Sequence, residues 1–136
     1  GIGAAVSGED ERGAQRLENS AALQERAAQM AAERNTAAQA EAARSTAAVR
    51  ASEQRLAALQ RSLAEQRRTL DRLRAERAQN PAATSEGARL QSELDALERD
   101  RRAAAARAGG PSADQVQSIE RRATELDAAL QRFGRI

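Results

Sequence analysis

Leucines in the middle of this chain recur at spacings of three, four and seven residues, at Leu56, Leu59, Leu63, Leu70 and Leu73. This is the heptad spacing of a helix with one buried face. From residue 21 to residue 52, by contrast, almost every apolar residue is alanine. A helical face that changes so sharply from Ala to Leu indicates a change in what the helix packs against.

The composition favours the same fold class. Alanine dominates the 40% of hydrophobic residues, and one Phe is the only aromatic residue. Such a composition with helical periodicity is typical of long helices and coiled coils, and no segment alternates with the period of two that a strand needs. The sequence therefore predicts an all-α chain.

Two clusters of helix-breaking residues divide the chain. Pro81 cannot continue a helix and excludes Asn80 from the α region, so we expect a loop over 79–85. Residues 109–112, Gly-Gly-Pro-Ser, predict a second loop, and Ser112 has the spacing of a capping box. Ser7 has a similar spacing near the N-terminus. We therefore predict helices at about 9–79, 85–108 and 112–133.

Both loops are short, which makes neighbouring helices antiparallel. A helix over 85–108, folded back from Pro81, would end beside Leu56, where the leucines begin. The sequence thus predicts a Gly/Ala-rich segment at 1–8, an Ala-rich stalk helix at 9–54 and an antiparallel three-helix bundle at 55–136. The expected bundle core is Leu56, Leu59, Leu63, Leu70, Leu73, Leu90, Leu94, Leu97, Val116, Ile119, Leu126, Leu130 and Phe133, with Ala123 on the same face of the third helix.

The stalk helix has no expected partner in its own chain. Its small residues recur at spacings of four and seven, an 11-residue pattern that gives a nearly straight supercoil. We predict that these residues form the interface of a homo-oligomer or filament: Ala27, Ala31, Ala38, Ala42 and Val49. The alternative is a lone helix that persists on alanine's propensity alone.

The first eight residues, Gly1-Ile2-Gly3-Ala4-Ala5-Val6-Ser7-Gly8, carry small residues at zipper-like spacing. This string resembles the end of a glycine-zipper segment in bacterial cell-envelope proteins. The resemblance implies an envelope location, membrane association through this segment and small-residue packing between subunits. The alternative is a flexible lead-in to the first helix.

The residue types in this chain argue against catalysis and metal binding. The chain has no Cys and no His, so we predict no catalytic residues, cofactor or metal. Acids between 93 and 100 would spread around a helix surface, where Asp95–Arg99 and Glu98–Arg102 have the spacing of ion pairs within one helix. Arg61–Glu65 and Arg67–Asp71 have the same spacing and are also predicted as pairs within one helix.

The arginines over 61–74 suggest phosphate binding, but acids interleave with them and no aromatic residue is available for stacking. Nucleic acid is therefore not the expected partner. Gln66 interrupts the leucine face, and Arg77 and Arg101 also fall on core-type positions. Arg77 adjoins a loop and is expected to be solvated there. For Gln66, solvation and control of helix register both remain open.

These patterns predict a non-enzymatic structural protein that self-assembles through its Ala-rich helix. All 22 basic residues are arginine, which together with the many Ala and Gly residues favours a GC-rich bacterial genome. The alternative is a helical adaptor or a chaperone-like module that binds other proteins, and a third hypothesis is a nucleic-acid-coating protein.

Overall fold

The computed structural model describes the backbone of residues 2–136 and the side chains of residues 10–136. It contains α1 (Ile2–Glu76), α2 (Pro81–Ala105) and α3 (Ala113–Phe133), and the described residues contain no strand. The predicted all-α class is confirmed. The chain divides into two units, Gly1–Arg44 and Ser45–Ile136. We call them the N-terminal unit and the C-terminal unit.

The first helix begins earlier than expected, at Ile2 instead of about residue 9. Ser7 therefore lies within α1, and its predicted role as a helix cap is wrong. Alanine is the best helix former, and a helix that is already nucleated extends easily through such residues. The predicted zipper packing of the Gly/Ala-rich segment 1–8 depends on side chains that lie outside the described residues.

The turn between α1 and α2 is shorter than the predicted loop, because Pro81 starts α2 instead of interrupting the chain. Proline suits the first position of a helix, where its missing N–H would have no partner. Asn80 has left the α region (φ −100°, ψ 111°), and its side chain accepts hydrogen bonds from the Ala82 and Ala83 amides at 3.1 and 3.4 Å. The loop prediction for 81–85 was therefore wrong, and α1 ends at Glu76.

The second turn lies close to its predicted place. Helix α2 ends at Ala105, three residues earlier than expected, and Gly109 and Gly110 both adopt positive φ angles (82° and 96°). Ser112 caps α3, where its hydroxyl oxygen accepts from the Gln115 amide at 3.4 Å. The predicted cap at Ser112 is confirmed.

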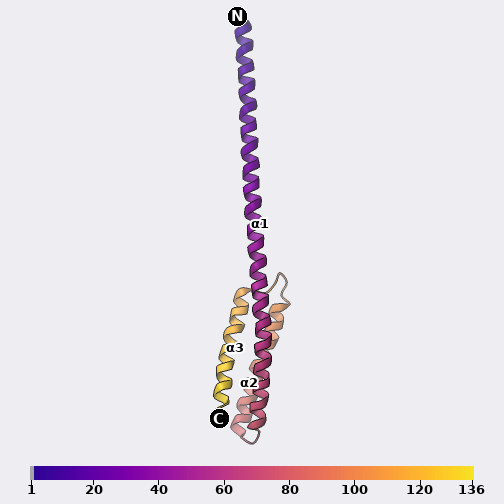
Figure 1. The fold of residues 1–136 in the computed structure, drawn as a ribbon, viewed down its shortest axis with the longest axis vertical. Helices are drawn as coiled ribbons and strands as arrows, with labels where there is room; N and C mark the ends of the chain where they lie inside the picture. The colour runs from indigo at the N-terminus through magenta and orange to yellow at the C-terminus, as the bar shows by residue number, and fades with distance from the viewer. Residues whose placement is uncertain (1) are drawn as a thin grey trace. The chain divides into compact units, whose positions relative to one another are not determined.

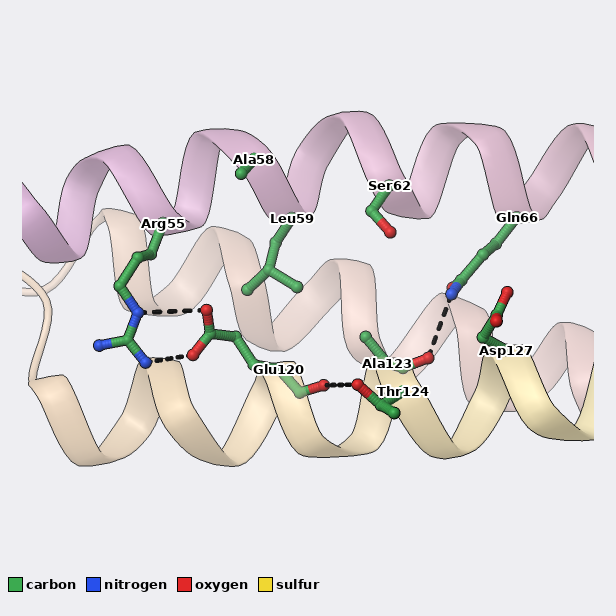
Figure 2. Close-up of a pocket in the computed structure, with 9 residues that line it drawn as sticks. All are labelled: Arg55, Ala58, Leu59, Ser62, Gln66, Glu120, Ala123, Thr124 and Asp127. Atoms are coloured by element: carbon green, nitrogen blue, oxygen red, sulfur yellow. Dashed lines mark hydrogen bonds and ion pairs between the residues drawn. The ribbon is translucent and has the colours of Figure 1, made fainter.

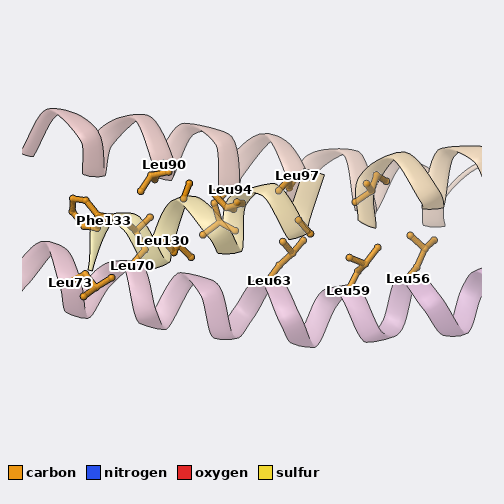
Figure 3. Close-up of a cluster of buried hydrophobic side chains, with 14 of the residues drawn as sticks. Leu56, Leu59, Leu63, Leu70, Leu73, Leu90, Leu94, Leu97, Leu130 and Phe133 are labelled. Atoms are coloured by element: carbon orange, nitrogen blue, oxygen red, sulfur yellow. The ribbon is translucent and has the colours of Figure 1, made fainter. Parts of the chain in front are cut away.

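Three helices pack against one another in the C-terminal unit, where α2 and α3 lie beside the last part of α1 (Figure 1). Their facing side chains form one apolar core (Figure 3). The side chains expected in the core are all buried, and so are four alanines. The buried apolar residues are Leu56, Leu59, Leu63, Leu70 and Leu73 from α1; Ala83, Leu90, Leu94, Leu97 and Ala104 from α2; and Val116, Ile119, Ala123, Leu126, Ala129, Leu130 and Phe133 from α3.

Candidate functional site: the exposed helix and the surface of the bundle

Every described side chain of the N-terminal unit, over residues 10–44, is exposed. The exposed set includes three large apolar side chains: Leu17 is 74% exposed, Leu23 64% and Met30 57%. The apolar surface of this stretch of α1 is therefore left uncovered by the described residues. Exposed apolar surface of this kind is typical of sites that bind a partner.

The residues predicted for an oligomer interface fall into two groups. Ala27, Ala31, Ala38 and Ala42 are exposed on α1. Val49 belongs to the C-terminal unit and is half-buried. A Cβ atom on Gly110 would lie only 2.7 Å from Val49 Cγ1, so the valine packs against the backbone of the α2–α3 turn. Part of the Val49 surface is thus covered by its own chain.

Ion pairs join each pair of helices in the C-terminal unit. Between α1 and α2, Arg67 donates to Asp95 at 2.6 Å and to Glu98 at 2.9 and 3.1 Å. These bonds, with Glu98 first, raise the pKa of Arg67. The ion pairs predicted within single helices are wrong for these residues. Arg67 does not pair with Asp71, and Asp95 and Glu98 bind an arginine of another helix. A planar guanidinium reaches two carboxylates at once when a second helix supplies them.

The other two bridges involve α3. Arg122 donates to Asp100 of α2 at 2.6 Å, and this bond lowers the pKa of Asp100. Arg55 of α1 binds Glu120 through two of its nitrogens and lowers the pKa of that carboxyl group. These ion-pair partners could not be predicted from the sequence, because residues 22 and 65 positions apart are not related by the period of a helix.

A shallow groove of about 440 Å³ lies between α1 and α3 in the C-terminal unit. Figure 2 shows its polar groups directed at one another: Arg55 at Glu120, and Gln66 at the Ala123 carbonyl. The Thr124 hydroxyl donates to the Glu120 carbonyl at 3.1 Å. The two charged groups Arg55 and Glu120 are thus paired with each other across the groove.

Two long polar side chains approach the core, with Gln66 buried in it and Arg77 half-buried at its end. Gln66 is 7% exposed, and its Nε2 donates to the Ala123 carbonyl at 3.1 Å, while Oε1 has no partner among the described residues. Arg77 lies over the Phe133 ring at 5.8 Å and donates to the Gly134 carbonyl at 2.5 Å. Arg77 therefore links the end of α1 to the end of α3. The prediction that Arg77 is solvated beside the loop is wrong.

Sequence reasoning missed several buried small residues. Ser52 is 3% exposed and lies four residues before Leu56, so the heptad spacing could have identified it. The buried alanines Ala83, Ala104 and Ala129 carried no such signal, because alanine is equally common on the exposed face of this chain.

Comparison with protein-family models, with curated proteins and with solved structures finds no match to this chain. Within the described part of the chain, no helix combines the length and the hydropathy needed to cross a bilayer. Function must therefore be argued from the surfaces described above.

Proposed function

We propose that this chain is a non-enzymatic structural protein that self-assembles into a homo-oligomer or filament through its alanine-rich helix. The observation that carries the proposal is the exposure of every described side chain over residues 10–44, Leu17, Leu23 and Met30 among them. Such a helix lacks the tertiary packing that supplies most helical stability in proteins. A second copy would supply that packing.

Alanine suits the interface because small side chains let two helix axes approach closely and lose little side-chain entropy on burial. The proposed contacts are made by Ala27, Ala31, Ala38 and Ala42, with Val49 at the edge of the contact. A bacterial source and a cell-envelope location belong to the same proposal, on the basis of the arginine-only composition and the zipper-like residues 1–8.

The test is a pair of matched substitutions two residues apart. Ala38→Glu places a charge within the proposed interface, and Ala40→Glu places the same charge about 200° away around the helix. We expect the wild-type chain to sediment as an oligomer at micromolar concentration, A38E to dissociate and A40E to behave like the wild type. A wild-type chain that sediments as a monomer would refute self-assembly.

The exposed Leu17, Leu23 and Met30 also favour a second candidate, a helical adaptor or chaperone-like module. Exposed flexible apolar side chains are typical of surfaces that accept varied partners. This function predicts that the chain stays monomeric and suppresses the aggregation of an unfolded test protein. Replacement of all three side chains by Ala would then abolish the suppression.

A further inference from the structure

The two units carry opposite net charge. The N-terminal unit has seven acidic residues against five arginines, a net charge of −2, and the C-terminal unit has 13 against 17, a net charge of +4. These values agree with the +2 of the whole chain. The imbalance gives the surfaces of the two units a mutual attraction, which is typical of surfaces that bind each other.

The negative charge of the N-terminal unit is ordered along one face of α1. Glutamate and alanine alternate there at separations of three and four residues, so they share one side of the helix. We call this set the acidic stripe: Glu11, Ala14, Glu18, Ala21, Glu25 and Ala28. All six side chains are exposed, and none of the three glutamates has an ion pair among the described residues.

The C-terminal unit carries a matching pattern of opposite sign on α1. Alanine and arginine alternate there at separations of four, three and four residues, in what we call the basic stripe: Ala57, Arg61, Ala64 and Arg68. All four side chains are exposed. Arg61 and Arg68 lie on the side of α1 away from the buried leucines, with the exposed Glu65 between them, and Ala64 lines a groove beside α2. Arg67 and Arg55 are bound to acids of the bundle, whereas Arg61 and Arg68 have no ion pair among the described residues.

We propose that the acidic stripe of one copy docks against the basic stripe of a second copy. Alanines in both stripes allow close approach of the helices, and the glutamates and arginines have the same seven-residue period. The basic stripe spans roughly 17 Å and the acidic stripe roughly 26 Å at 1.5 Å per residue, so the longer accommodates the shorter. In this docking, the complement of each stripe is supplied by a second copy of the chain.

This contact joins two different surfaces, so each bound pair retains one unused stripe of each sign. A heterologous contact of this kind produces a filament, or a ring where the rotation closes. The inference rests on the proposed self-association and adds a second, head-to-tail contact to it. The acidic stripe is separate from the proposed interface alanines Ala31 and Ala38, which lie about 100° away around the helix.

A charge swap tests the docking directly. Glu18→Arg with Glu25→Arg makes both stripes of one variant positive, and Arg61→Glu with Arg68→Glu makes both stripes of the other negative. We expect each double variant alone to associate roughly tenfold or more weakly than the wild type, since attraction becomes repulsion. An equimolar mixture is expected to recover association, because each variant then meets its complement.

The matched control is Glu33→Arg with Glu125→Arg, which changes the net charge by the same amount at exposed acids outside both stripes. It is expected to sediment like the wild type, and wild-type association is expected to weaken with added salt. If the wild type associates but the stripe variants do so equally well, or if their mixture fails to recover, this docking is refuted while self-assembly stands. A monomeric wild type would refute the proposed function itself.

Discussion

The two units differ in how far the side chains of α1 are buried. In the C-terminal unit, leucine recurs on α1 at spacings of three, four and seven residues, and α2 and α3 cover it. In the N-terminal unit, alanine occupies the comparable positions and every described side chain remains exposed. The comparison teaches that side chains on a helix can be buried against other helices or left exposed, depending on the size of the side chains on one face.

The contrast is tested most strongly by matched truncations of leucine. Leu94 is fully buried, and Leu94→Ala is expected to lower the free energy of unfolding of the C-terminal unit by about 2–5 kcal/mol, because it opens a cavity in the core. Leu23 is 64% exposed, and Leu23→Ala is expected to cost less than about 0.5 kcal/mol. Urea unfolding followed by circular dichroism, at one fixed protein concentration, measures both. Equal effects would contradict the division into covered and uncovered regions.

Glycine-to-alanine substitutions are expected to change stability in opposite directions in the two units. Gly110 has φ +96° and no room for a Cβ beside Val49, so Gly110→Ala is expected to destabilise the fold by about 1–3 kcal/mol. Gly13 lies in open space on α1, and Gly13→Ala is expected to favour the helix by about 0.5–1 kcal/mol. Thermal unfolding midpoints and helical signal report the two effects, and a stabilising G110A would show that the turn repacks freely.

Substitution of Gln66, the polar residue in the core, is expected to change the stability of the C-terminal unit by a smaller amount. Gln66→Leu removes a buried Oε1 that has no partner and loses one hydrogen bond to Ala123, so we expect a gain of about 1 kcal/mol in stability. Gln66→Ala should instead destabilise, because it leaves a cavity. If Q66L is more stable but populates extra oligomers, Gln66 controls helix register; if only stability changes, it does not.

Acid should weaken the C-terminal unit by the smallest amount. Hydrogen bonds from Arg122 and Arg55 lower the pKa values of Asp100 and Glu120 in the folded state. A folded pKa below the unfolded value means that this stability is fully present above the unfolded pKa and is lost as pH falls through the folded pKa. As the pH falls from about 5 to about 3, we therefore expect a small loss of stability, because both pairs are partly exposed and screened by solvent.

The control for this titration is Asp100→Asn, which removes one of the two carboxylates. Its unfolding midpoint should be lower than that of the wild type at pH 7 and should depend less steeply on pH in the acid range. A wild-type midpoint that stays constant from pH 5 to pH 3 would show that these pairs contribute nothing measurable.

Much of the bundle could be predicted because its signals are local. The spacing of Leu56, Leu59 and Leu63 indicates a buried helical face without reference to any other segment. Pro81 and Gly110 mark the two turns for steric reasons that act on neighbouring atoms. The boundaries were less predictable, since proline ends one helix and can also begin the next, as Pro81 does here.

The candidate surfaces were predictable only in part. The alanines that spacing predicts for an interface lie on an exposed stretch of helix, and the interface itself stays a prediction. The sequence could not predict that Arg61 and Arg68 have no ion pair among the described residues, because neighbouring Arg67 is equally basic and yet is bound by two acids of α2. Which arginine remains available depends on the rotation of α1 against α2.

The sequence by itself determined that this protein is helical, where its chain turns and which face of each helix is apolar. These properties follow from local sterics and from a period of 3.6 residues, which each segment carries alone. The tertiary structure decided the ion-pair partners of Arg55, Arg67 and Arg122, the burial of Gln66 and the choice of core alanines. Those outcomes depend on the register and rotation between helices, which are fixed only when three separate segments pack together.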